Sequence, residues 1–253
     1  MENKLEIIGF NIESCLAAQE AGADRIELCG SPGEGGTTPS YGLVQSAREK
    51  LEIDLYVMIR PRGGDFLYTD NEFEMMMKEV EFCKRSGCDG IVTGALTPDG
   101  HVDKEKCKIL IDLAFPMEVT FHRAFDRVAD PFASLEDLIT LGFERILTSG
   151  LKPKAVQNTH LLSQLIQKSA GRIIIMPGSG VNSENIISIA EKTGAKEFHS
   201  SASFLEKSEM KFVSKEMNEV LEYISVNKDE VKNMKKLLNN FTRSEKNNLE
   251  NIF

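Results

Sequence analysis

Short apolar runs alternate with longer amphipathic segments along most of this chain. Their starts lie roughly 20 to 36 residues apart, a spacing that suits one strand–helix step each. The pattern therefore predicts eight strands, each followed by a helix. The eight runs are LEIIGF from Leu5, RIELC from Arg25, DLYVMIR from Asp54, GIVTGA from Gly90, EVTFHR from Glu118, RILTSG from Arg145, RIIIMPG from Arg172 and EFHSSA from Glu197.

The segments between the runs carry signals for the ends of helices. Thr69 and Glu72 form a capping-box pattern ahead of apolar residues at helical spacing. Asp130 followed by Pro131 is typical of an N-cap and the first helical turn. These signals place helices where the strand–helix alternation requires them.

Two α/β topologies can be built from eight such units. A doubly wound open sheet usually carries a Gly-rich fingerprint after its first strand, and LEIIGFNIES contains no GxGxxG. Closure into a barrel removes exposed strand edges, and a barrel needs about 250 residues, close to the 253 of this chain. We therefore expect an α/β fold, a single-domain (β/α)8 TIM barrel over residues 1–225. Residues 226–253 should form a short C-terminal helical extension that is frayed from about Asn239.

Composition and charge narrow the class of protein. The net charge of −9 argues against nucleic acid as a partner, because phosphate binding needs an excess of Lys and Arg. The opening MENKLEII suggests no signal peptide, and no apolar run approaches the ~18 residues that span a bilayer. The five cysteines, an odd number without a CxxC pair, predict reduced thiols. We expect a cytoplasmic protein that binds neither nucleic acid nor membrane.

Charged residues inside the apolar runs are the main signal for a functional site. Strands of a buried parallel sheet are nearly all apolar, so each charge there needs a partner or a role. Most of these charges lie near the C-terminal ends of their runs, where barrels of this type build their sites. They are Glu6, Glu27, Arg60, His122, Arg123 and His199.

Glu27, Arg60 and His122 are the candidate catalytic residues. A buried Glu27 facing Arg60 across the barrel would form either a structural ion pair or part of a charged site. His122 is suited to act as an acid, a base or a ligand, although a lone histidine is often simply hydrogen-bonded within the fold.

Other residues near the same strand ends are candidates for binding an anion. Arg62 follows Arg60 in MIRPRGGDFLY, and the arginine fork suits carboxylate or phosphate, although local acidic residues would neutralise such a turn. The GSG of MPGSGV offers backbone amides after the seventh run, where barrels often bind phosphate, and a plain turn is the alternative. The full set is Arg62, Arg123, Asp126, Gly178, Ser179, Gly180, His199 and Ser200.

Spacing alone indicates no metal site. The chain contains no HxxxH, HxH or dense Cys/His cluster, so a zinc or hard-metal site has no support from the sequence. Cys29 is the one thiol at the end of an apolar run and is the single candidate metal ligand, for copper(I), if a partner exists. The alternative is a buried, inert cysteine.

Several blocks together resemble the CutC family, whose members are called copper homeostasis proteins. The resemblance runs from about Leu5 to Ser203 through GADRIELC, EGGTTPSYG, VMIRPRGGDFLY, GALTPDGHVD, TFHRAFD, LGFERILTSG, MPGSGV and EFHSSAS. It implies a (β/α)8 barrel, a cytoplasmic location, a homodimer and a role in copper handling. A copper(I) site proposed for some members uses the cysteine of RIELC and a second cysteine on the first strand. Cys29 matches the former, whereas Ile8 stands at the latter position.

Two hypotheses of function follow from these observations. In the first, suggested by the resemblance and Cys29, the chain binds or carries copper(I). In the second, the chain is a barrel enzyme or binding protein for a small anionic or phosphorylated metabolite, which the charged and Gly-rich strand ends favour. The two make different demands, because copper(I) prefers soft sulfur ligands whereas these strand ends are mainly charged.

Overall fold

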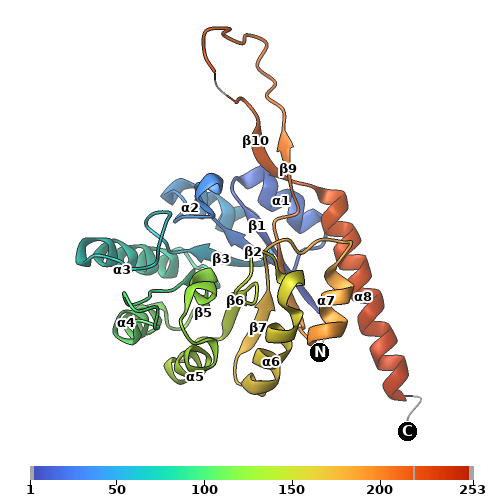
Figure 1. Ribbon diagram of the computed structural model, residues 1–253. Helices are drawn as coiled ribbons and strands as arrows, with labels where there is room; N and C mark the ends of the chain where they lie inside the picture. Colours follow the sequence, from blue (N-terminus) through green and yellow to red (C-terminus); the bar gives the residue numbers. More distant parts are fainter. Residues whose placement is uncertain (1–2, 219, 251–253) are drawn as a thin grey trace.

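Eight parallel strands, built mainly from buried residues, form the frame of the computed structural model, which describes residues 3–218 and 220–250 (Figure 1). Each strand pairs with the next along the chain from β1 to β7, and β8 pairs with β1. Strands β7 and β8 lie side by side without a hydrogen-bonded ladder in the described part of the chain, so the barrel is nearly closed. The predicted (β/α)8 barrel is confirmed. The strands are β1 (Lys4–Gly9), β2 (Arg25–Leu28), β3 (Asp54–Met58), β4 (Gly90–Thr93), β5 (Glu118–Phe121), β6 (Arg145–Thr148), β7 (Ile174–Pro177) and β8 (Glu197–Ser200).

Helices follow the strands and surround the barrel. Thr69 and Glu72 form the predicted capping box, and Asp130 accepts hydrogen bonds from two backbone amides of the following turn. Among the described residues, no helix is long and apolar enough to cross a membrane. The α-helices are α1 (Ile12–Glu20), α2 (Tyr41–Lys50), α3 (Asp70–Arg85), α4 (Lys104–Ala114), α5 (Pro131–Leu141), α6 (Thr159–Ser169) and α7 (Ile186–Thr193), and the 3-10 helices are η1 (Pro32–Glu34), η2 (Arg123–Arg127) and η3 (Ala155–Asn158).

The chain leaves the barrel through an antiparallel hairpin that the sequence did not predict. Strands β9 (Ser203–Glu206) and β10 (Tyr223–Val226) pair with each other, and the segment between them projects away from the barrel (Figure 1). We call residues 203–218 and 220–226 the arm. Its exposed apolar side chains include Phe212, Val213 and Val220.

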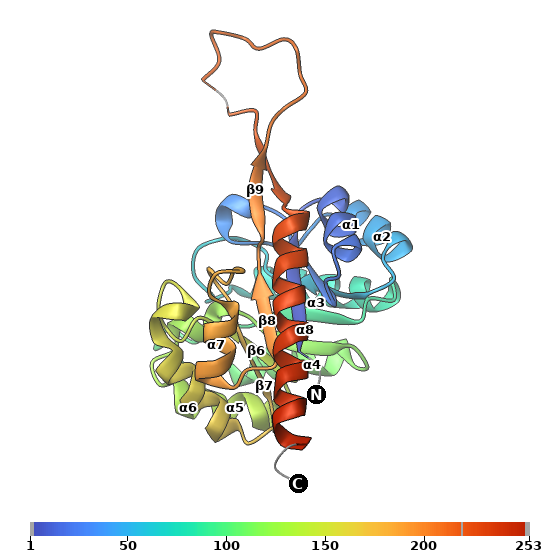
Figure 2. The same cartoon turned by 90° about the vertical axis from the view of Figure 1, so that its right-hand side faces the viewer.

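A long C-terminal helix, α8 (Lys228–Glu250), then runs down the side of the barrel (Figure 2). Val231, Met234 and Leu238 are buried against the rest of the fold, and Lys235 forms an ion pair with Asp24 at 2.6 Å. The predicted helical extension is confirmed. The helix continues to Glu250, through the segment from Asn239 for which fraying is expected. Residues 251–253 lie outside the described part of the chain.

Much of the charge found in the apolar runs belongs to a buried ionic network inside the barrel. Arg25 contacts Glu6 and lies 2.8 Å from Glu197, and Arg145 lies 2.7 Å from Glu197. Arg145 also contacts Glu118 at 3.1 Å. Arginines and glutamates from several strands therefore neutralise one another in ion pairs, and these residues connect the strands beneath the mouth of the barrel.

Candidate functional site

A cavity of about 320 Å³ opens at the C-terminal ends of the strands. Its apolar walls include Phe10, Met58, Phe66 and Ile224, the last from the base of the arm. Seven of the residues selected from the sequence line this one cavity. They are Glu27, Arg60, His122, Arg123, Ser179, Gly180 and His199.

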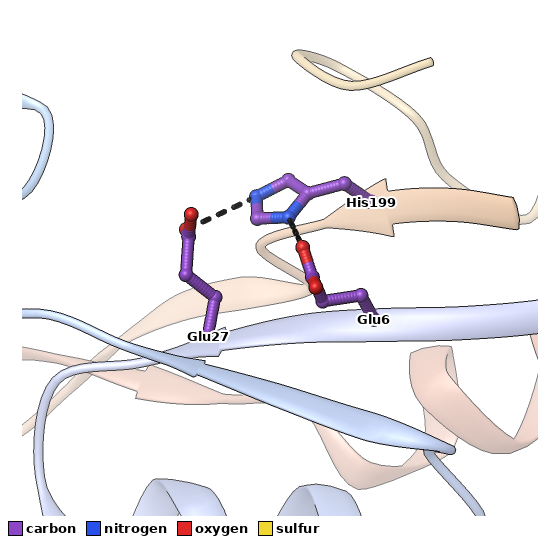
Figure 3. A group of neighbouring side chains, drawn as sticks. All are labelled: Glu6, Glu27 and His199. Carbon is purple, nitrogen blue, oxygen red and sulfur yellow. Dashed lines mark hydrogen bonds and ion pairs between the residues drawn. The ribbon is translucent and has the colours of Figure 1, made fainter. Parts of the chain in front are cut away.

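His199 lies between two buried carboxylates (Figure 3). Its Nδ1 is 2.7 Å from Oε1 of Glu6, and its Nε2 is 3.7 Å from Oε2 of Glu27. The register of β1 against β8 places Glu6 opposite His199. The second oxygen of Glu6 accepts a hydrogen bond from Nε of Arg25. Both oxygens of Glu6 are therefore occupied, and Glu6 fixes the orientation of the imidazole.

The two carboxylates of this group titrate very differently. Burial alone would raise the pKa of Glu6, but Arg25 and His199 outweigh it and lower that pKa to about 2. Burial raises the pKa of Glu27 to about 7, against the attraction of His199. Burial acts to lower the pKa of His199, but Glu27 and Glu6 outweigh it and raise the value. Glu27 therefore exchanges a proton near neutral pH while Glu6 stays ionised.

Glu27 also has an oxygen free to act on a ligand. Its Oε1 has no hydrogen-bond partner among the described residues, although the side chain is almost fully buried. Its Oε2 accepts a hydrogen bond from Sγ of Cys29 at 3.7 Å. A buried carboxylate oxygen without a partner is costly, which favours a ligand or a proton at this position.

His122 presents a neutral imidazole to the same cavity. Burial, together with repulsion from Arg60, lowers its pKa to about 3. Its Nδ1 accepts a hydrogen bond from the backbone amide of Ala124 at 3.3 Å, so we assign the proton of the neutral ring to Nε2. Within the described chain, Nε2 has no partner. The ring packs against Phe66 with the centroids 4.7 Å apart.

Arg60 is held by backbone oxygens, so of the two alternatives considered for Arg60 and Glu27, the direct ion pair does not occur among the described residues. Nη1 donates to the carbonyls of Glu34 and Gly36 at 3.0 and 2.9 Å, and Nη2 donates to the carbonyl of Gly64 at 3.0 Å. Nε is buried and has no acceptor in the part of the chain that the structure describes. Within the described residues, no carboxylate forms an ion pair with this guanidinium.

The other candidates at this end of the barrel divide into lining and supporting residues. Arg62 does not line the cavity, because Glu72 at 2.6 Å and Asp65 at 3.0 Å bind its guanidinium. Arg123 lines the cavity, and its Nε is 2.7 Å from Asp126. Asp126 itself accepts hydrogen bonds from Thr148, Ser149 and Leu151, so it fixes the turn after β6.

The GSG turn contributes only part of the predicted anion site. Ser179 and Gly180 line the cavity, and both have left-handed backbone φ angles of 72°. No hydrogen bond from either amide occurs among the described residues. The amide of Gly178, however, donates to the carbonyl of Thr148 at 3.0 Å, so it is not free for a ligand. Ser200 lies beside the cavity, and its hydroxyl donates to the carbonyl of Val181 at 2.6 Å.

Cys29 fits copper(I) poorly. Its thiol is fully buried beside Tyr56, Met58 and Val92, with Ile8 packed against this group. Burial and the neighbouring Glu27 raise the pKa of the thiol, which opposes formation of the thiolate that binds metals. Neither Cys29 nor any other described cysteine lines the cavity. A single protonated thiol does not supply the sulfur ligands that copper(I) prefers.

Three side chains that could together approach a metal ion lie close to one another, an arrangement that spacing along the sequence could not reveal. One ligand atom each from Glu6, Glu27 and His199 lies within 4.8 Å of the others. The three residues come from β1, β2 and β8, which are far apart in sequence and adjacent in the barrel. Sequence analysis noted all three charges but gave no role to Glu6, and it missed the apolar walls formed by Phe66 and Ile224.

Comparison with known proteins places the chain in a family. Residues 3–204 match the family model described as the CutC family. This chain belongs to the CutC family. It is 51% identical over 208 residues to the copper homeostasis protein cutC homolog of Homo sapiens, covering 82% of this chain and 76% of that protein. The CutC family protein of Parabacteroides distasonis is 48% identical over 213 residues, covering 84% and 88% of the two chains.

Solved structures agree with this assignment. The CutC protein from Streptococcus agalactiae has a TM-score of 0.76 and 34% identity, covering 79% of this chain and 98% of that chain. Phosphoribosylanthranilate isomerase from Thermotoga maritima has a TM-score of 0.57 at 14% identity, covering 95% and 99%. At that identity the second comparison concerns the barrel fold alone.

Proposed function

We propose that this CutC-family chain takes part in copper homeostasis, the role for which its human and mouse relatives are named. The observation that carries the proposal is the 51% identity over 208 residues to the human protein. The family match, residues 3–204, includes every polar residue that we place at the cavity.

The experiment is deletion of the gene in its source organism, followed by growth across a copper series. We expect altered copper tolerance or cell copper content, restored by the wild-type chain. Unchanged tolerance and unchanged copper content would contradict the proposal.

The cavity favours a second function, the binding and conversion of a small anionic or phosphorylated metabolite. Two side chains that line the cavity each carry a buried donor without a partner in the described chain, Nε of Arg60 and Nε2 of His122. The free amides at Ser179 and Gly180 add further donors on the same cavity. Buried donors of this kind are normally satisfied, so a ligand with acceptor oxygens is the natural complement. The enclosed volume suits a molecule of metabolite size.

Inorganic phosphate and oxalate are simple probes of this second function. We expect either anion to bind the wild type with weak but saturable affinity in calorimetry. Arg60→Ala should lose at least roughly tenfold in affinity, because the buried charge that meets the anion is removed. Arg62→Ala is the matched control, since Arg62 is two residues away and does not line the cavity. Equal loss in both variants, or no binding to the wild type, would contradict the assignment.

We also propose that the chain is a cytoplasmic homodimer. All five cysteines are free and buried, which is compatible with a reducing compartment. The exposed apolar side chains of the arm, Phe212, Val213 and Val220, offer a surface that a second copy would cover. Sedimentation of the wild type should give a dimer, and cell fractionation should find the chain in the cytoplasm. A monomer at all concentrations, or an exported chain, would contradict these proposals.

A further inference from the structure

We propose that the cavity catalyses proton transfer at a carbon next to a carbonyl group, with Glu27 as the base and His122 as the hydrogen-bond donor to the carbonyl oxygen. The substrate class is a small carbonyl compound that carries a carboxylate or phosphate. This inference rests on the anionic-ligand function proposed above and specifies its reaction.

Glu27 has the placement that a general base needs. Its unpartnered Oε1 belongs to a side chain that lines the cavity, while Oε2 is held by Cys29 and lies near His199. Its side chain is almost fully buried, and a desolvated carboxylate whose oxygen has no partner in the described chain binds a proton more readily than one in water. Glu6 orients His199 on the far side, which fixes the ring beside Glu27.

His122 has the placement of a neutral electrophile. Nδ1 accepts a hydrogen bond from the backbone amide of Ala124, so the proton of the neutral ring is on Nε2. In the described chain this Nε2 has no partner. The ring is fixed by Phe66 and Phe121, with centroids at 4.7 and 5.9 Å. A neutral imidazole donates a hydrogen bond to a carbonyl oxygen without itself losing a proton, as in the enolisation enzymes that pair a carboxylate base with a neutral histidine.

Arg60 and the apolar walls determine the substrate class. The guanidinium of Arg60 carries a charge that no carboxylate of the described chain neutralises, and Nε has no acceptor. An anionic group on the substrate would supply a counter-charge for the guanidinium and an acceptor for Nε. Phe10, Met58 and Phe66 exclude water around the reacting carbon, which strengthens the charge interactions inside the cavity. The volume of about 320 Å³ is enough for a small metabolite of this class.

The proposed step balances without a metal or an oxidant. The carboxylate of Glu27 takes the proton from the carbon, and the C–H electron pair forms a carbon–carbon double bond. The carbonyl π pair moves to oxygen, giving an enolate that accepts hydrogen bonds from His122. Return of the proton from Glu27, to the same carbon or to its neighbour in a hydroxycarbonyl compound, regenerates the enzyme.

A metal bound by Glu6, Glu27 and His199 is the competing use of the same residues. Both oxygens of Glu6 are already occupied, by His199 and by Arg25, and the cation of Arg25 repels a metal ion at this position. Only Glu27 and Nε2 of His199 then remain as ligands, too few to hold a metal tightly. Proton transfer uses the group as it stands, with no rearrangement of Glu6.

Hydrogen exchange with solvent tests the reaction directly. Pyruvate, hydroxypyruvate and dihydroxyacetone phosphate are incubated with the metal-free protein in deuterated buffer, and loss of the C–H signal is followed by proton NMR. We expect exchange of at least one probe above the protein-free rate, unaffected by chelator. Absence of exchange with all three probes, or exchange that requires added Zn²⁺ or Cu²⁺, would overturn the inference.

Matched variants assign the roles. Glu27→Gln should lower the exchange rate by roughly 10² or more, and His122→Asn by roughly 10², because each removes one acid–base or oxyanion contribution. Glu74→Gln and His160→Gln lie outside the cavity and should leave the rate unchanged. Binding of oxalate is measured in parallel. If the wild type binds oxalate but exchanges no probe, the proposed reaction is wrong and the ligand site stands. If the wild type neither binds oxalate nor exchanges a probe, the ligand site is wrong as well.

Discussion

Replacement of Glu27 by glutamine should stabilise the fold in a strongly pH-dependent manner. Glu27 is a buried carboxyl whose pKa rises from 4.5 to about 7 on folding, first because of burial and despite attraction from His199. A raised carboxyl pKa means that the folded state binds the proton more tightly than the unfolded state. Its contribution to stability is therefore complete below pH 4.5 and is lost as the pH rises through about 7.

The size of the effect follows from the shift in pKa. Each unit corresponds to about 1.4 kcal/mol, so the change from 4.5 to about 7 corresponds to roughly 3 kcal/mol of lost stability at alkaline pH. The glutamine side chain of the variant has the same shape as Glu27 and never ionises. The groups that face Glu27 are His199, Glu6, Cys29 and Arg25, and His199 titrates together with it, so the figure describes the group as a whole.

Urea unfolding at several pH values measures this prediction. The difference in unfolding free energy between Glu27→Gln and wild type should be small near about pH 5 and should grow in favour of the variant to roughly 3 kcal/mol near about pH 9. Glu74→Gln is the control, because Glu74 is an exposed residue of α3 paired with Lys78, and its difference from wild type should not change over this range. A constant difference for Glu27→Gln, or a difference of opposite sign at alkaline pH, would refute the reasoning.

Three further outcomes test the barrel and the thiol. Arg25→Met should destabilise the protein by roughly 3–5 kcal/mol in urea, because it leaves Glu6 and Glu197 buried without their shared cation. Gly178→Ala should cost about 1–3 kcal/mol, since a Cβ there would overlap Leu147, whereas Gly33→Ala meets no atom within 4 Å and should be close to neutral. Copper(I) competition with a chromophoric chelator should show weak binding that Cys29→Ser leaves unchanged; a tight one-to-one complex lost in that variant would contradict our view of the thiol.

The barrel could be predicted because its signals are local. Each strand is a short apolar run, and each helix start has its own cap, such as the capping box of Thr69 and Glu72. The arm escaped prediction because β9 is mostly exposed and β10 buries only Val226 fully, so neither strand has a buried face that would produce an alternating pattern. Helix α8 was predicted from its buried stripe, but the contact that holds its far part was not, since Asn3 bonds Thr242 from the other end of the chain.

The charged residues of the strands could be found from the sequence, but their roles could not. Glu6 and Glu27 occur in similar apolar runs, yet Glu6 is saturated by Arg25 and His199 whereas Glu27 retains an oxygen without a partner in the described chain. This distinction depends on depth within the barrel and on partners from other strands, and no local pattern records either. The same limit applies to Arg60, because its acceptors are backbone carbonyls of two loops and not a charged side chain, which no local pattern indicates.

The groups that line the cavity are poor ligands for copper, so a role in copper homeostasis need not involve binding of copper itself. Copper(I) prefers thiolate and thioether ligands, whereas Met58 is the one sulfur-containing residue among the described lining and the polar groups there are carboxylate, imidazole, guanidinium and hydroxyl groups. The pKa of the Cys29 thiol is raised by burial and by Glu27, so the thiolate is disfavoured at neutral pH. If the chain serves copper homeostasis through a reaction on an organic ligand, complementation of copper tolerance should fail with Glu27→Gln and succeed with Cys29→Ser. Failure of Cys29→Ser alone, with the variant folded and abundant, would instead assign the role to the thiol.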